Sequence, residues 1–254
     1  MIRVVLLGSG NVASFLFEAF SASEKVKVVQ VYNHSKASLS KFEAKVPVTS
    51  SFEELKEADV YLISVKDDAI AAIAENLKGK VSLVLHTSGA VPLGSLEGHP
   101  RRGVFYPLQT FSKNREVLNR NIPFCLEASR PEDLELLKQL AREISGTPFE
   151  VSSEQRKKLH LAAVFVCNFV NHLYVIGEGL CRENDLPFEI LQPLILETAE
   201  KAVHSSPSEN QTGPAKRNDQ STIEAHLDLI NSKENKEIYQ LLTRAIQTTH
   251  GKKL

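Results

Sequence analysis

A chain of 254 residues with 42% apolar and 24% charged residues has the composition of a soluble globular protein and room for one large or two modest domains. Its net charge of -1, with scattered basic residues, argues against binding to nucleic acid or to an anionic membrane surface. The three cysteines are far apart and match no metal or redox motif, which favours a reducing compartment. The sequence predicts no secretory signal and no membrane-spanning run, so we expect a cytoplasmic protein.

The first 151 residues alternate short apolar runs with amphipathic stretches. Continuous β-branched runs predict buried strands at residues 4–7, 26–32, 59–65, 81–86, 103–106, 122–126 and 148–151. Helical patterns lie between them at residues 12–20, 36–44, 68–77 and 131–144. This order predicts an α/β fold, with an N-terminal Rossmann domain at residues 1–151 built on a doubly wound, mostly parallel sheet.

The character of the sequence changes after residue 151, because no further strand pattern follows. Residues 159–181 form a long helical stretch that is apolar almost all round, so both of its sides should be covered, one of them by a second subunit. Further helices are expected at residues 188–204, 222–230 and 236–248, with a polar loop at 205–219. We therefore expect an all-helical domain at residues 152–254 that binds substrate and forms a dimer.

The strongest motif is Gly8-Ser9-Gly10-Asn11-Val12-Ala13, a G-x-G-x-x-A sequence between the first strand and the first helix. Gly8 would allow the tight turn, Gly10 would let the backbone approach a pyrophosphate, and Ala13 would let the helix pack close to the sheet. The free N–H groups at the start of the helix would then face the phosphates. The alternative is an ordinary glycine turn, but the complete βαβ pattern favours a dinucleotide.

The end of the second strand indicates which dinucleotide. It carries Asn33, His34, Ser35 and Lys36, with no acidic residue where an NAD enzyme would bind the ribose 2′-hydroxyl. These side chains are donors suited to a 2′-phosphate, so NADP is favoured over NAD. A merely polar turn is the alternative.

Loops at the carboxyl ends of the later strands should border the nicotinamide, because ligands bind there in parallel sheets. The candidate cofactor residues in these loops are Ser64, Val65, His86 and Ser88. Local turn hydrogen bonds are an equal alternative for His86 and Ser88. For Asp67 and Asp68 we predict capping of the following helix rather than catalysis.

Five segments in this order carry a likeness to a known family, namely residues 8–13, 86–89, 103–111, 159–163 and 212–219. Together they resemble a bacterial family of Rossmann-like oxidoreductases with a helical C-terminal domain of unknown function. That family lies in the 6-phosphogluconate-dehydrogenase-like group, with pyrroline-5-carboxylate reductase, ketopantoate reductase, prephenate dehydrogenase and deazaflavin-dependent NADP reductases. The likeness covers nearly the whole chain and implies a homodimer joined through the helical domains, with substrate held between the two domains.

The resemblance also implies roles for residues near the substrate. His160 would donate a proton to a substrate carbonyl or imine, and Asn168 would hydrogen-bond the substrate. The remaining candidate substrate residues are Tyr106, Gln109, Asn171 and Arg217. Tyr106 stands where prephenate dehydrogenase has a histidine, which counts against that chemistry. For His160, Asn168 and Asn171, a hydrogen-bonded structural role inside a dimer core is the alternative.

Arg217 could bind a substrate carboxylate with both arms of its guanidinium, while Asp219 could hold Arg217 or cap the next helix. No zinc-like cluster, serine-hydrolase elbow or nucleotide-triphosphate loop is present in the sequence, and no metal is expected. The leading hypothesis is an NADP-dependent oxidoreductase that reduces a carbonyl or imine of a small metabolite. The alternative is a non-catalytic dinucleotide-binding protein that senses redox state or assists assembly.

Overall fold

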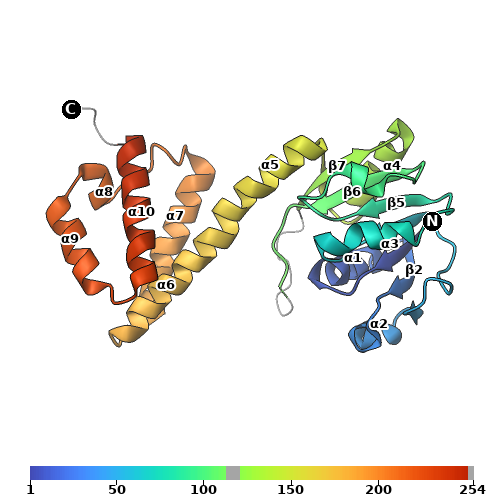
Figure 1. Ribbon diagram of the computed structural model, residues 1–254, viewed down its shortest axis with the longest axis horizontal. Coiled ribbons are helices and arrows are strands. Elements are labelled where there is room, and N and C mark those ends of the chain that lie inside the picture. Colours follow the sequence, from blue (N-terminus) through green and yellow to red (C-terminus); the bar gives the residue numbers. More distant parts are fainter. Residues whose placement is uncertain (113–120, 251–254) are drawn as a thin grey trace. The chain divides into compact units, whose positions relative to one another are not determined.

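The computed structural model describes residues 1–112 and 121–250 (Figure 1). It divides into two compact units, Met1–Asn168 and Phe169–Leu254, which are described separately below. The strands of the described residues all lie before residue 151, so the predicted change from α/β to all-helical structure is observed. The compact division instead falls inside a later helix, and the domain boundary at 151/152 stays a prediction.

In the described part of the chain, one sheet orders its strands β3-β2-β1-β4-β5-β6-β7-β8. All neighbouring strands are parallel except β6 and β7, which confirms the predicted doubly wound, mostly parallel sheet. The strands are β1 (Ile2–Leu7), β2 (Val26–Tyr32), β3 (Val48–Thr49), β4 (Val60–Ile63), β5 (Leu83–His86), β6 (Arg102–Pro107), β7 (Pro123–Ala128) and β8 (Thr147–Glu150).

Helices and single helical turns connect these strands. They are α1 (Asn11–Ser21), η1 (Lys36–Leu39), α2 (Ser40–Glu43), η2 (Asp67–Ala69), α3 (Ile70–Glu75), η3 (Leu93–Leu96) and α4 (Pro131–Glu143). Several ends follow from local sequence. For example, α4 begins at a proline, which suits a first helical position, and carries two acidic residues in its first turn, which favour that end of the helix dipole.

The strands are apolar on both sides because helices cover both faces of the sheet. Along β1, Val4 and Leu6 pack into the layer formed with α1, α2 and α4, whereas Val5 and Leu7 pack into the layer formed with α3 and η3. All four side chains are fully buried. Each contributes roughly 1.5–3 kcal/mol of hydrophobic stabilisation, so the glycine turn that follows Leu7 starts from a fixed position.

A single helix runs over residues Ser153–Glu183. It consists of α5 (Ser153–Ala163), a π-helical segment η4 (Val164–Phe169) and α6 (Val170–Glu183). A capping box starts it, because the Ser152 hydroxyl accepts from the Gln155 N–H and the Gln155 side chain accepts from the Ser152 N–H.

The same helix corrects the expectation that no run of the chain could span a membrane. By length and composition alone it is apolar enough to do so, because an 18-residue stretch within it has a mean hydropathy of 1.6 and at most two charged residues. Its apolar side chains are largely exposed in the single chain. A helix that packs against another protein copy meets the same criterion, so the criterion by itself assigns no membrane role.

The second unit contains only helices among its described residues. Those after α6 are η5 (Phe188–Leu191), α7 (Gln192–His204), α8 (Pro214–Arg217), α9 (Gln220–Leu229) and α10 (Lys233–His250). The predicted helices are confirmed, but α8 lies inside the segment predicted as a polar loop. Asp219 caps α9 by accepting from the Thr222 N–H at 3.2 Å. Its Oδ2 also lies 3.9 Å from Nη2 of Arg217.

Candidate functional site

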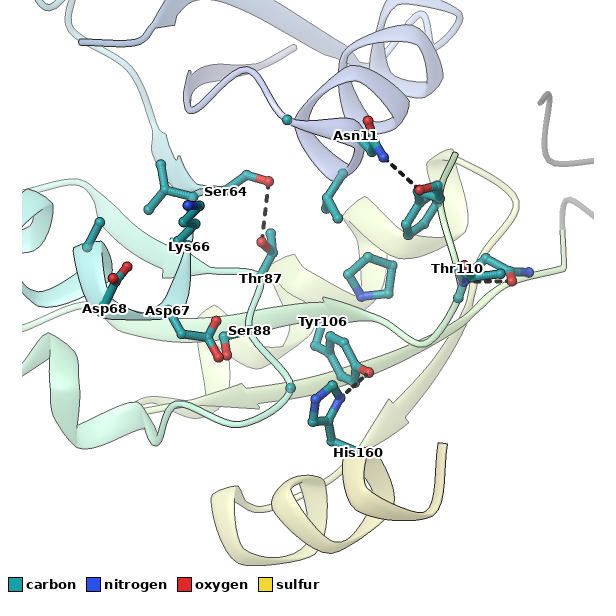
Figure 2. Close-up of a pocket in the computed structure, with 18 of the residues that line it drawn as sticks. Asn11, Ser64, Lys66, Asp67, Asp68, Thr87, Ser88, Tyr106, Thr110 and His160 are labelled. Atoms are coloured by element: carbon teal, nitrogen blue, oxygen red, sulfur yellow. Dashed lines mark hydrogen bonds between the residues drawn. The ribbon is translucent and has the colours of Figure 1, made fainter. Parts of the chain in front are cut away.

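A cavity of about 1190 Å³ opens within the first unit. Its walls are formed by the loops that follow β1, β2, β4, β5 and β6, and by the π segment and the end of α5. These loops leave the carboxyl ends of the parallel strands, which is where ligands bind in such sheets. Figure 2 shows the side chains that converge there.

The first glycine of the motif shapes the turn rather than the cavity. Gly8 has φ of +127°, a backbone conformation that favours glycine. A Cβ at this position would lie 2.0 Å from the Ser64 carbonyl oxygen, so the turn also needs glycine to pass close to the end of β4. Gly8 does not line the cavity, and its predicted role in a tight turn matches this geometry.

The second glycine has the opposite surroundings. A Cβ at Gly10 would meet no protein atom within 4 Å, and Gly10 lies at the cavity wall. It is the residue before α1, and no side chain caps the helix, so the first N–H groups of α1 are open to a ligand. An open backbone beside the positive end of a helix dipole fits the pyrophosphate of a dinucleotide.

The predicted cofactor residues around this turn divide into two sets. Those that line the cavity are Ser9, Gly10, Asn11, Val12, Asn33, His34, Ser64, Val65 and Ser88. Ser35 and Lys36 lie outside the cavity wall, although both follow β2 as expected. Asn33 is nearly buried, and its amide donates to the Ser35 carbonyl at 3.3 Å. Asn33 and His34, the lining residues directly after the end of β2, include no carboxylate, in agreement with the sequence.

Asn11 also fixes the far wall. Its amide donates to the carbonyl of Phe111 at 2.8 Å, and the centroid of the Phe111 ring lies 4.6 Å from that of the Phe15 ring. The chain after β6 is therefore held against the start of α1. Gln109 lines the same wall, and its side-chain oxygen accepts from the Thr110 N–H at 2.8 Å.

Asp67 and Asp68 differ from the prediction that they cap a helix. Both lie in η2, where no side chain makes a capping hydrogen bond, and both line the cavity. Figure 2 shows Asp67 directed toward Ser88. Its negative charge contributes to raising the pKa of Tyr106, so it lies close enough to act on the site electrostatically. The sequence pattern missed this because first-turn acids usually serve the helix.

His86 is another predicted cofactor residue that does not line the cavity. It is fully buried at the end of β5, and its Nδ1 accepts from the Ser88 backbone N–H at 3.2 Å. Burial, reinforced by the positive charge of Arg156, lowers the pKa of His86 to about 4. It is therefore a neutral residue that supports the turn, and the cofactor role is corrected to the structural alternative.

This buried histidine predicts an acid-dependent loss of stability. Because the folded-state pKa of about 4 lies below the ordinary value of 6.5, the unfolded chain binds the extra proton first. Stability should be complete above pH 6.5 and fall by about 3 kcal/mol as the pH drops toward 4. Urea unfolding over that pH range should show a smaller decline for His86→Asn, whereas the exposed control His34→Asn should follow the wild type. Equal declines for all three proteins would contradict this assignment.

The most specific contact in the cavity joins Tyr106 and His160. The Tyr106 hydroxyl lies 3.0 Å from His160 Nδ1, and the two rings meet edge to face (Figure 2). Burial raises the pKa of Tyr106 to about 12, with Cys125 and Asp67 adding to the shift, so the phenol stays protonated and donates. Nδ1 is then the acceptor, and the proton of a neutral His160 lies on Nε2.

Gly89 makes this pair possible. A Cβ there would lie 2.7 Å from His160 Nδ1 and 2.8 Å from the Tyr106 ring. The backbone of the β5 loop thus passes directly against both side chains. Both rings line the cavity, and no described residue bonds to His160 Nε2.

Arg156 fixes the helix that carries His160. Its guanidinium is fully buried and donates to Glu127 on β7 at 2.5 Å and to the Val91 carbonyl at 2.7 Å. Ser153 joins the same cluster by donating to Glu127 at 2.7 Å. A buried cation held this way ties α5 both to the sheet and to the loop that contains Gly89. No sequence pattern predicted this cluster, because Glu127 and Val91 are distant from Arg156 in the chain.

The π segment brings Cys167 and Asn168 to the cavity wall. The side-chain amide of Asn168 makes no hydrogen bond with the described residues, so it is available to a ligand. π-Helical turns often occur at functional sites because the extra residue per turn redirects the side chains. Asn171 and Arg217, the other predicted substrate residues, belong to the second unit, and their roles stay predictions.

The two halves of the chain match different family models. Residues 3–87 match the family described as NADP oxidoreductase, coenzyme F420-dependent, and residues 122–246 match the domain of unknown function DUF2520. A search of the curated proteins finds no match.

Solved structures resemble the chain over almost its whole length. A Bacteroides fragilis protein, provisionally named an NADP oxidoreductase, is 39% identical, with a TM-score of 0.89 over 97% of this chain and 98% of that one. A Thermotoga maritima protein is 21% identical, with a TM-score of 0.71 over 97% and 98%. An imine reductase from Myxococcus stipitatus, solved with NADP+, is 14% identical, with a TM-score of 0.69 over 98% and 96%, and shares the fold.

Proposed function

Because the chain belongs to a Rossmann-like NADP oxidoreductase family with a C-terminal helical domain, we propose that it reduces a carbonyl or imine carbon of a small metabolite. The observation that carries this proposal is the Tyr106–His160 pair, which opens on the same cavity as the uncapped start of α1. One cavity therefore holds a phosphate-binding helix end and a proton-transferring side chain. NADPH, when bound, supplies the hydride.

His160 is the proton donor in this proposal. Addition of a hydride to a carbonyl or imine carbon leaves a negative charge on oxygen or nitrogen, which must take up one proton. A histidine suits this transfer because its ordinary pKa lies near neutral pH, so the ring can take up a second proton from solvent. In that imidazolium form Nδ1–H donates to the Tyr106 oxygen, and Nε2–H passes its proton to the substrate, which leaves a neutral ring. Its Nε2 makes no hydrogen bond among the described residues, and Nδ1 is held by Tyr106, so the ring is oriented while one nitrogen is left for substrate.

Tyr106 acts on His160 rather than on the substrate directly. Its hydroxyl holds Nδ1, and its raised pKa keeps it from losing its own proton at neutral pH. Asn168, on the next turns of the same helix, offers an amide that can bind the substrate oxygen or nitrogen. In this proposal the site positions the substrate and supplies a proton, while the cofactor supplies the reducing equivalents.

The proposal is tested with a variant that should lose turnover but still bind NADPH. His160→Ala should lower kcat for NADPH oxidation about 100-fold, the usual scale of general acid catalysis, while the Kd for NADPH changes less than twofold. Wild-type protein is first assayed with a panel of 2-oxo acids, aldehydes and cyclic imines. Binding of NADPH without turnover of any compound would contradict the enzyme and favour the non-catalytic alternative.

Gly89→Ala provides a second variant that removes no functional group. Its added methyl would push against the two rings, which can move, so the fold should survive while the Tyr106–His160 hydrogen bond is broken. We expect kcat to fall at least tenfold with an unchanged Kd for NADPH. If Gly89→Ala kept the wild-type kcat, the orientation of His160 by Tyr106 would not contribute to catalysis, and that part of the mechanism would be wrong.

We also propose that two copies of the chain pair through the second unit. Its helices expose large apolar side chains that a monomer in water would normally bury, namely Leu173, Val175, Leu186, Ile190, Leu194, Leu196 and Val203. These residues extend from α6 through η5 to α7. Covering them with the same surface of a second copy would satisfy both chains.

A further inference from the structure

A lysine that lies outside every predicted motif reaches the glycine turn. Lys41 on α2 places its ammonium 2.8 Å from the Ser9 carbonyl oxygen and 2.5 Å from the Ser14 hydroxyl. Ser9 lies between the two glycines of the motif, and Ser14 lies in the first turns of α1. A positive charge is therefore held against the turn, beside the cavity wall formed by Ser9 and Gly10.

The position along the sheet edge indicates which part of the cofactor this charge meets. The pyrophosphate fits at Gly10 and the start of α1, and the nicotinamide belongs near the loops after β4 and β5. The adenosine ribose would lie at the end of β2, where an acidic residue would bind the 2′-hydroxyl of NAD. Lys41 lies on α2, which follows β2 after the single turn η1, and its ammonium reaches the carbonyl of Ser9.

Several side chains could offer positive charge to a 2′-phosphate near the end of β2. His34 lines the cavity, whereas Ser35, Lys36 and Lys41 lie outside its wall, so lining alone does not choose between the two lysines. The Asn33 amide is engaged by the Ser35 carbonyl. Lys45 lies two residues after the end of α2, and its ammonium pairs with the Glu18 carboxylate at 2.7 Å. Of these lysines, Lys41 alone is hydrogen-bonded to the glycine turn in the described structure.

We infer that Lys41 binds the 2′-phosphate of NADP and sets the preference for NADP over NAD, an inference that rests on NADP being the cofactor. The Ser9 carbonyl and the Ser14 hydroxyl hold the ammonium near its binding position before the cofactor arrives. When NADP binds, the ammonium exchanges the neutral Ser9 carbonyl for a phosphate oxygen, which is a stronger, charge-assisted partner. NAD has no 2′-phosphate, so the ammonium stays bonded to the Ser9 carbonyl and forms no new contact with the cofactor.

The test measures binding, so it does not depend on turnover. Dissociation constants for NADPH and NADH are measured by titrating nucleotide fluorescence for wild type, Lys41→Ala, Lys41→Arg and Lys45→Ala. Lys41→Ala should weaken NADPH at least tenfold and NADH less than twofold, which removes most of the preference. Lys41→Arg should retain the preference, and Lys45→Ala should match the wild type.

The remaining outcomes separate this inference from the proposed function. Equal weakening of both nucleotides by Lys41→Ala would place the lysine at the pyrophosphate or in the fold and would overturn the inference. Selective weakening by Lys36→Ala, with Lys41→Ala unchanged, would overturn it in favour of the other lysine. Wild-type protein that binds neither nucleotide would overturn both the inference and the proposed reductase, whereas NADPH binding lost in Lys41→Ala without any turnover would overturn only the reductase.

Discussion

Gly10→Ala is expected to weaken NADPH binding at least tenfold while leaving the melting temperature of the free protein within about 2–3 °C of wild type, a change of about 1 kcal/mol or less. The added methyl would meet no protein atom within 4 Å, so the fold has room for it. The same methyl would occupy the space through which a pyrophosphate reaches the first N–H groups of α1. Fluorescence titration and thermal unfolding measure the two effects.

Gly8→Ala is the matched control, because the same added atom should produce the opposite pair of results. Its Cβ would lie 2.0 Å from the Ser64 carbonyl oxygen, at a φ of +127° that alanine rarely adopts. We expect a loss of about 3 kcal/mol or more in unfolding free energy, from steric overlap and backbone strain together. If both variants destabilised the fold equally, the separation of the two glycines into a structural and a ligand-facing residue would be wrong.

Val175→Asp should convert a dimer of two 28.2 kDa chains into monomers at micromolar concentration. Val175 lies on α6 within the exposed apolar surface of the second unit, and an aspartate there would have to lose its hydration if that surface became buried. Light scattering coupled to size-exclusion chromatography gives the mass directly. Lys201→Asp, on the neighbouring α7, adds the same side chain at a charged position and should stay dimeric.

Two results would count against the proposed pairing. If the wild-type protein were monomeric, no second copy would cover the apolar surface, and the proposed pairing would be wrong. A Val175→Asp protein that stayed dimeric while Lys201→Asp dissociated would place the interface on the charged side of α7 instead.

The N-terminal half of the fold could be predicted because its signals are local. Residues 4–7 read as a buried strand from four consecutive apolar side chains, and the glycine turn and helix follow immediately. Three elements were missed because they are too short to show a periodic pattern. β3 spans two residues, and η3 and α8 span four residues each.

The site was predictable where it is built from strand ends and not where it depends on tertiary contacts. Ser9, Ser64 and Ser88 line the cavity as expected, since each follows a recognisable strand. Lys41 and Arg156 were missed because the contacts that define their roles are distant in the chain. Ser9 and Ser14 for Lys41, and Glu127 and Val91 for Arg156, lie at least 27 residues away and become neighbours only in the folded structure. Local pattern assigns such residues to exposed helix surfaces.

His86 shows the converse error. A polar side chain at the end of a central strand suggests a ligand-facing residue, yet the direction of the strand's last side chain decides between cavity and core. Here the imidazole is turned inward and serves the Ser88 backbone. The identity of the residue could not distinguish the two outcomes.

Two contacts of α5 set its register along β6. Arg156 is fastened to Glu127, which pairs with Val104 on β6, whereas His160 contacts Tyr106 two residues further along that strand. Four helical residues rise about 6 Å and two strand residues advance about 7 Å, so the helix and the strand cover similar distances between these two contacts. Because each helical residue turns about 100°, the spacing between anchor and imidazole tolerates no insertion or deletion, however conservative the residue types.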